Sequence, residues 1–310
     1  MRSQTLQQQI DSNTRVSVFY LLLSILLLSV IGATFTGYYS PETWYFGAIL
    51  AATVGITYAI ISWHLGSKIV LKLTQARNTT KQEKQILDNV AEEMAIAAGI
   101  PKPQVYIIDD EAPNAFATGK DPENGIVVFT TGIIKKLNRD ELQGVMAHEI
   151  AHIRNYDIRF MTIVAVIVGL IPLLSEVFLR SMFYSGRSRN SSNKGSSGGI
   201  LIIIGIALAI LAPLFAILLK MAVSRKREYL ADASAAKFTR YPEGLASALE
   251  KIANEAKNME KPVKTIEHMY IVNPLNPFEK KVWSLFSTHP PIEDRVAALR
   301  GKPKQNKRKK

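Results

Sequence analysis

His148-Glu149-Ile150-Ala151-His152 is the stretch on which the interpretation of this chain rests. In an α-helix, residues four positions apart lie on one face, so both imidazoles can reach one metal ion. Neutral imidazoles suit zinc, which lowers the pKa of water to about 7. Glu149 would then lie where a carboxylate can take the proton of a water that attacks a peptide carbonyl. The pentamer therefore predicts a zinc site of the metallopeptidase kind, with Glu149 as its general base.

The residues around the pentamer predict the helix that it requires. Asn138 and Glu141 have the spacing of a capping box, in which each side chain binds the backbone N–H of the other residue. Gly144 is unfavourable inside a helix but admits a close neighbour. His148 and His152 lie beside an apolar stripe, so we expect a buried site. The stripe consists of Leu142, Val145, Met146, Ile150 and Ile153.

The composition is that of a basic chain with long apolar runs. Lysine and arginine number 38 against 26 acidic residues, a net charge of +12, and 47% of the residues are hydrophobic. Because the basic residues flank the apolar runs, we expect contact with lipid and solvent and no nucleic-acid partner. The chain has no cysteine, which excludes disulfides and thiolate ligands and fits a reducing compartment.

Four apolar runs reach the roughly 20 residues that cross a bilayer. They are residues 16–36, 44–65, 160–179 and 199–219. The third is the weakest, because Asp157 and Arg159 border it and Glu176 interrupts it near one end. A glutamate there is more typical of the membrane interface than of a functional site. The first run is long and soon followed by the second, so we interpret it as a span and not as a cleaved signal peptide.

Lysine and arginine predict the orientation of these spans. The loop at 37–43 has none, whereas basic residues border the opposite ends of the first, second and fourth runs: Arg2, Arg15, Lys68, Lys72, Arg77, Lys220, Arg225, Lys226 and Arg227. Both termini and residues 66–157 are therefore expected in the cytoplasm. The basic residues of 180–198 argue against this scheme. We still place that loop outside, because spans three and four must form a hairpin for the site to assemble. Its Gly/Ser/Asn-rich part, 185–199, is typical of a flexible linker.

A third zinc ligand is expected on the helix that follows the fourth run. Residues 224–236 are alanine-rich, which favours a helix. Glu228 and Asp232 share one face of it; the first can bind zinc, and the second can accept a hydrogen bond from a ligating histidine. An ordinary helix whose acids pair with Arg225 and Arg227 has the same spacing. Spacing alone leaves both interpretations open.

These motifs resemble the HtpX family of membrane zinc proteases, whose relatives include the CAAX prenyl endopeptidases. The resemblance rests on the HExxH pentamer followed, after a membrane hairpin, by Glu228-Tyr-Leu-Ala-Asp232. Further matches are Pro113-Asn-Ala-Phe-Ala-Thr-Gly119, Asn155-Tyr-Asp157 and Ser287-Thr-His-Pro-Pro-Ile-Glu-Asp-Arg295. The order of the parts agrees over the whole chain except the basic tail.

The resemblance implies one zinc ion per chain. It assigns the metal to His148, His152 and Glu228, and the general base to Glu149. It also implies that Asp232 and Asp157 support the ligands from behind.

Two further residues become candidates for contacts to the substrate or the oxyanion through the resemblance. Asn114 and His289 can each donate a hydrogen bond to a developing negative charge. Asn114 as a turn residue after Pro113, and His289 as a turn histidine held by Pro290, remain equally open. Arg295 is expected to form a salt bridge with a nearby acid.

Short β-branched runs predict a small sheet beside the site. Residues 105–109 and 125–130 read as strands, with 114–118 as a third, and 82–98 as an amphipathic helix packed on them. An exposed strand edge beside the zinc would let an extended substrate add as a further strand. Backbone pairing of this kind is largely independent of sequence.

The expected fold is an α+β, mostly helical membrane protein: four transmembrane helices with a cytoplasmic, gluzincin-like zinc protease domain that carries a small sheet. Its parts are two membrane helices (1–65), a protease part with the HExxH helix (66–157), a membrane hairpin (158–222), a second protease part with the third ligand (223–300) and a basic disordered tail (301–310).

The resemblance implies an endopeptidase of the cell membrane that removes misfolded or damaged membrane proteins at the cytoplasmic face, in protein quality control and stress response. Its partners would be polypeptides and the lipid bilayer, with the oligomeric state left open. A prenyl-protein endopeptidase uses the same chemistry, but four spans are few for its larger chambered bundle. A catalytically silent scaffold has no need of both metal motifs, and a metal transporter would need more acids or histidines within its spans.

Overall fold

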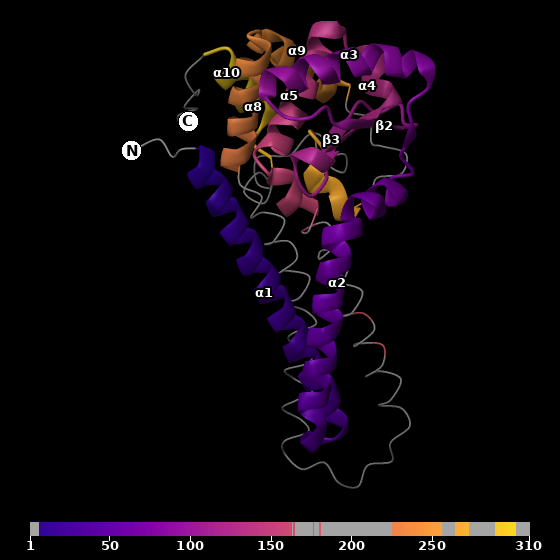
Figure 1. Cartoon of the computed structure of the whole chain (residues 1–310), viewed down its shortest axis with the longest axis vertical. Helices are drawn as coiled ribbons and strands as arrows, with labels where there is room; N and C mark the ends of the chain where they lie inside the picture. Colours follow the sequence, from indigo (N-terminus) through magenta and orange to yellow (C-terminus); the bar gives the residue numbers. More distant parts are fainter. Residues whose placement is uncertain are drawn as a thin grey trace, which may run out of the picture. The chain divides into compact units, whose positions relative to one another are not determined.

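The computed structural model describes residues 6–162, 164, 176, 180, 225–255, 264–272 and 289–301. The chain divides into two compact units: one consists of residues 14–64 and 163–220, and the other of residues 1–13, 65–162 and 221–310. Figure 1 shows the described elements along the chain. The candidate site lies entirely in the second unit.

Most of the described residues are helical. The α-helices are α1 (Leu6–Tyr39), α2 (Trp44–Leu73), α3 (Lys81–Ala98), α4 (Thr131–Lys136), α5 (Arg139–Arg154), α8 (Arg225–Thr239), α9 (Pro242–Asn254) and α10 (Ile292–Leu299). The strands are β1 (Arg77–Asn78), β2 (Gln104–Ile108), β3 (Ala115–Thr118) and β4 (Ile126–Thr130). Short 3-10 helices cover Pro41–Thr43, Pro122–Asn124 and Lys264–Met269.

In the first unit, the helices α1 and α2 carry the first two apolar runs. Within the described part of the chain, one helical stretch, Pro41–Leu73, is long and apolar enough to cross a membrane, and a shorter apolar stretch, Leu21–Gly37, lies in α1. The two helices approach closely where Gly32 faces Gly47. A Cβ on Gly47 would lie only 2.1 Å from the carbonyl oxygen of Gly32, so there is no room for a side chain there. The fourth run, most of the third and the 185–199 linker lie outside the described residues.

The second unit is built on a small mixed sheet. Over the residues that the structure describes, the strand order is β1-β2-β4-β3. Strand β2 runs parallel to β4, with Val105 opposite Val127, and β3 runs antiparallel to β4, with Ala115 opposite Phe129. These strands confirm the three that the sequence predicts, whereas the two-residue β1 has no sequence signal.

Helix α5, which carries the HExxH pentamer, lies at the centre of the second unit. It packs against α3, α8 and α9 and against β3 (Figure 1). The predicted capping box is confirmed: Asn138 accepts from the N–H of Glu141 at 2.9 Å, and Glu141 accepts from the N–H of Asn138 at 2.9 Å. The predicted helix at 82–98 is confirmed as α3. The capping box fixes the first turn of α5, and the elements packed around the helix hold its two histidines inside the core.

Gly144 lets helix α9 pack directly on the backbone of α5. A Cβ at this position would lie 2.6 Å from the backbone nitrogen of Leu245, and a Cβ on Gly244 would lie 2.6 Å from the carbonyl oxygen of Asp140. The close neighbour that a small residue at 144 could admit is therefore the backbone of α9. This close packing explains why glycine, which is unfavourable in helices, occupies this position of α5.

Gly144→Ala is expected to destabilise the protein. The forced separation of the two helices should cost about 1–3 kcal/mol, more than the roughly 1 kcal/mol that alanine gains over glycine within a helix. The midpoint of thermal unfolding in detergent should fall by several degrees. Lys237→Ala, at an exposed position of α8, is the control for a neutral change to alanine. An unchanged midpoint for Gly144→Ala would mean that the two helices separate freely.

The edge of the sheet is not open to an added strand where β3 begins. Strand β3 is fully buried, and the carbonyl of Ala115 accepts from the N–H of Ile271 at 2.9 Å. The segment Lys264–Val272 therefore covers this part of the edge. The contact joins residues far apart in sequence, so no local pattern could indicate it.

Candidate metal centre

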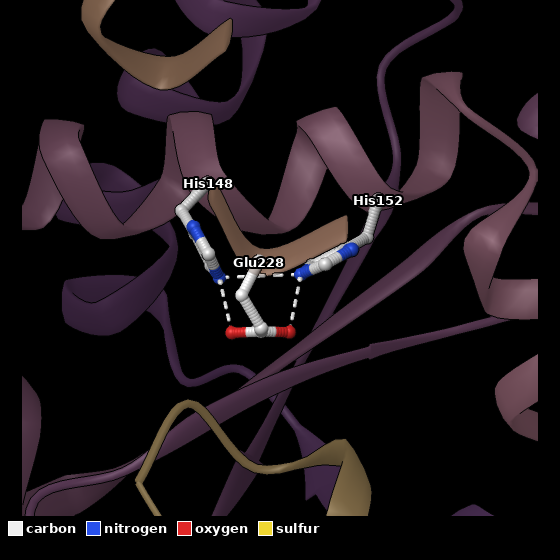
Figure 2. A group of neighbouring side chains, drawn as sticks. All are labelled: His148, His152 and Glu228. Carbon is white, nitrogen blue, oxygen red and sulfur yellow. Dashed lines mark hydrogen bonds and ion pairs between the residues drawn. The ribbon is translucent and has the colours of Figure 1, made fainter. Parts of the chain in front are cut away.

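Three side chains from two helices converge in the core of the second unit. His148 and His152 extend from α5, and Glu228 extends from the first turn of α8 (Figure 2). All three are almost fully buried, with at most 3% of each residue exposed. Their possible ligand atoms lie within 4.8 Å of one another. The structure thus brings together the three residues that the sequence nominates as metal ligands.

The spacing of these atoms fits a tetrahedral ion. The two histidine Nε2 atoms are 3.2 Å apart, and they lie 3.8 Å (His148) and 3.5 Å (His152) from the nearer oxygen of Glu228. Two ligands at about 2.05 Å from a tetrahedral zinc ion would be about 3.4 Å apart. Both oxygens of Glu228 are buried, and its described cationic neighbours, His289 and Arg295, contact Oε2 at 3.1 and 3.4 Å. Oε1 faces Nε2 of His152, so a cation between the two histidines and Glu228 would complete the pairing of this carboxylate.

The far nitrogen of each imidazole is held by a carboxylate. Nδ1 of His148 lies 3.0 Å from Oδ1 of Asp232, and Nδ1 of His152 lies 3.1 Å from Oδ2 of Asp157. A proton on each Nδ1 leaves each Nε2 as a lone-pair donor toward the centre of the cluster. The donor set therefore fits zinc in chemistry as well as in spacing.

Burial and charge set the protonation of the two histidines. Burial lowers the pKa of His148 to about 4, although the hydrogen bond to Asp232 opposes this. Burial also lowers the pKa of His152, but the hydrogen bond to Asp157 and the charge of Glu228 outweigh it and raise the pKa to about 9. His148 is thus a neutral ligand at physiological pH, and His152 must release a proton when a metal binds.

Glu149 lies beside the cluster without belonging to it. It is 1% exposed, and its carboxylate interacts with the backbone N–H of Ala117 on β3. Burial raises the pKa of Glu149 to about 8, and the charge of His152 counteracts part of this rise. A carboxyl group with a pKa near neutrality can both accept and return a proton.

Two arginines form ion pairs with the buried carboxylates behind the histidines. Arg295, which is fully buried, donates to Asp232 at 2.9 and 2.7 Å. Arg227 lies 3.7 Å from Asp157 and stacks on the ring of Phe160. The expectation that Arg295 forms a salt bridge is confirmed. Its complete burial against the metal site was not foreseen, because nothing in the spacing of 287–295 indicates its depth.

The two candidate substrate contacts lie in different surroundings. His289 is buried, with Nδ1 3.1 Å from Oε2 of Glu228, so it belongs to the wall of the site. Burial would raise the pKa of Glu228, but the charges of His289 and Arg295 hold it well below its usual range. Asn114 instead uses its amide to hold a segment of the chain: it donates to the carbonyl of Val272 at 2.8 Å and accepts from the N–H of Ala115 at 3.1 Å.

A helical core that buries an HExxH helix against the helix of a third, acidic ligand defines the class of zinc-dependent metallopeptidases. Within that class, residues 81–302 match Peptidase family M48. The chain belongs to this family and, within it, to the HtpX homologues.

The relatives match over nearly their whole length. A "Protease HtpX homolog" of Dictyoglomus turgidum is 46% identical over 300 residues, which cover 97% of this chain and 96% of the relative. Another, of Caldanaerobacter subterraneus, is 43% identical over 306 residues, 97% of this chain and 99% of the relative. A third, of Listeria monocytogenes, is 42% identical over 300 residues, 94% of this chain and 98% of the relative. Family membership and the buried cluster confirm the expected membrane zinc metalloprotease.

Among solved structures, the chain is similar to the crystal structure of S. mikatae Ste24p. The sequence identity is 22% and the TM-score is 0.49, with 88% of this chain and 62% of that chain covered.

Proposed function

We propose that this membrane zinc endopeptidase cleaves misfolded or damaged membrane proteins at the cytoplasmic face of the cell membrane. One observation carries the proposal: both Nε2 atoms and the carboxylate of Glu228 face one another at ligand spacing, while both Nδ1 atoms are held from behind. The relatives named as proteases support the peptide bond as the bond that is cleaved.

We assign the metal to His148, His152 and Glu228. When bound, zinc supplies a Lewis acid that polarises the scissile carbonyl and makes water a stronger nucleophile. Glu149 takes the proton of the attacking water and later gives it to the leaving amine. Asp232 and Asp157 hold the imidazoles in the tautomer that leaves Nε2 free.

His289 is proposed to contact the substrate or the developing oxyanion. It lies just before Pro290 and Pro291, which precede α10, and its Nδ1 lies 3.1 Å from Oε2 of Glu228, the third ligand in the proposal. A nitrogen at this place can donate a hydrogen bond to a carbonyl oxygen that gains charge. Asn114 has a different place in the proposal, since its amide is already used by Val272 and Ala115. Its part would be to hold the segment Lys264–Val272 against β3.

Four transmembrane helices with both termini in the cytoplasm remain our proposal for the membrane part. The helical stretch Pro41–Leu73 supports the second span. The protease domain would then be assembled from 66–157 and 223–300 on either side of the membrane hairpin at 158–222. The basic residues that flank the first, second and fourth runs support this orientation. The tail at 301–310 would lie at the cytoplasmic surface.

The test uses the full chain purified in detergent with a chelator present. Addition of one equivalent of zinc is expected to start cleavage of an unfolded membrane protein and of the chain itself, and renewed chelation should stop it. A folded copy of the same substrate should be cleaved far more slowly. Preferred cleavage of a farnesylated CAAX peptide would support the prenyl-protein alternative instead. No zinc-dependent cleavage of any of these would contradict the proposal.

A further inference from the structure

We infer that Arg295 is a positioning residue of the metal site: it fixes Asp232 and Glu228 in the orientation that zinc requires. The inference rests on the proposed function, because it concerns the same metal. It goes beyond the ligand set by assigning a task to a residue that touches neither the metal nor the substrate.

The first observation is a two-point contact with Asp232. Nε of Arg295 donates to Oδ2 at 2.9 Å, and one terminal nitrogen donates to Oδ1 at 2.7 Å. The planar guanidinium matches the carboxylate in this geometry, so it fixes the rotation of the carboxyl group. Oδ1 of Asp232 is also the atom 3.0 Å from Nδ1 of His148. Arg295 therefore sets the angle at which a ligating imidazole is held.

The second observation is that the same guanidinium reaches Glu228. Its other terminal nitrogen lies 3.4 Å from Oε2 of Glu228 and donates to the carbonyl of Ile271 at 3.3 Å. Glu228 and Asp232 lie one turn apart on α8, so the guanidinium of Arg295 can contact both carboxylates at once. The carbonyl of Ile271 fixes the guanidinium in turn. Arg295 thereby joins α8, α10 and the segment that covers β3.

The third observation concerns charge. Four buried carboxylates, those of Glu149, Asp157, Glu228 and Asp232, lie at the site; Arg295 is fully buried beside Glu228 and Asp232, and Arg227 lies beside Asp157. Two guanidinium groups and one divalent cation together balance these four charges. By Coulomb's law alone, however, a fixed positive charge near a metal site weakens the binding of a cation. A positioning role and a purely electrostatic role therefore predict opposite effects on zinc affinity when the charge is removed.

The experiment measures zinc affinity by competition with a coloured chelator on the full chain. Arg295→Lys keeps the charge but loses the planar fork, and Arg295→Gln loses both. If Arg295 positions the acids, zinc should bind about 10–100-fold more weakly in both variants, as is usual for residues behind metal ligands. The visible spectrum of the cobalt-substituted protein should change, and kcat should fall more than KM rises. Unchanged zinc affinity in both variants, or tighter binding in Arg295→Gln, would overturn the inference.

Arg300 offers a matched control. It lies just after α10, and its guanidinium donates hydrogen bonds to Glu243 and Glu250, which do not belong to the metal cluster. Arg300→Lys should lower the unfolding midpoint slightly and leave the zinc affinity and the cobalt spectrum unchanged. An equal loss of zinc affinity in Arg300→Lys would mean that any loosening of α10 disturbs the site, and would also overturn the inference. Failure of the wild-type chain to bind zinc would instead overturn the proposed function.

Discussion

Glu149→Gln is expected to keep its zinc and to lose roughly 10²–10⁴-fold in proteolytic rate, the usual contribution of a general base. The amide has the shape of the carboxyl group, so the buried position is filled without a cavity. It has no basic oxygen that could take the proton of an attacking water. Glu149 is not among the three residues whose ligand atoms converge, so metal binding should not suffer.

The measurement combines zinc content per chain with the rate of cleavage of an unfolded membrane protein. Glu92→Gln makes the same chemical change at an exposed position of α3 and should behave as the wild type. If Glu149→Gln turns over substrate at the normal rate with its zinc in place, another group is the base. Loss of zinc from this variant would instead place Glu149 among the ligands.

The HExxH helix could be predicted from the sequence, because the features that form it lie within one short segment. The capping box at Asn138 and Glu141, the apolar stripe and the four-residue spacing of the histidines all lie within one helix. The strands β2 and β4 follow from β-branched runs in the same way, whereas β3, Ala115–Thr118, contains only one β-branched residue. Such features depend on neighbours a few residues away, which a single sequence displays in full.

The third ligand shows where local reasoning ends. The spacing of Glu228 and Asp232 fits a surface helix as well as a metal site, and only the packing of α8 against α5 places the carboxylate opposite the histidines. The resemblance to a known family supplied this contact, because a family motif carries tertiary information that one sequence lacks.

Long-range contacts account for what the sequence did not indicate. The segment that covers β3 contacts it through Ile271 and Val272, and the hydrogen bond between Asn114 and Val272 joins residues 158 positions apart in the sequence. The burial of Arg295 depends on α10 packing against α8 and α9. Neither contact follows from hydrophobic periodicity, which indicates that a face is buried but not what covers it.

Glu228→Ala is expected to abolish stoichiometric zinc binding and, with it, proteolysis. Loss of a residue behind the ligands lowers metal affinity about 10–100-fold, so removal of a ligand should lower it by more than roughly 100-fold. The two histidines would remain, but two imidazoles alone leave a zinc ion with half of its four positions unfilled by protein. The zinc content after dialysis against a weak chelator measures the loss.

A comparison on the same helix separates ligation from packing. Asp232→Asn removes an acid one turn away that contacts His148 and Arg295; its zinc affinity should fall less than that of Glu228→Ala. Lys237→Ala, on the exposed side of α8, should leave it unchanged. Since alanine favours helices more than glutamate does, unwinding of α8 would not explain metal loss in Glu228→Ala. Full zinc occupancy in that variant would remove Glu228 from the ligand set, and the two histidines would then need another third partner.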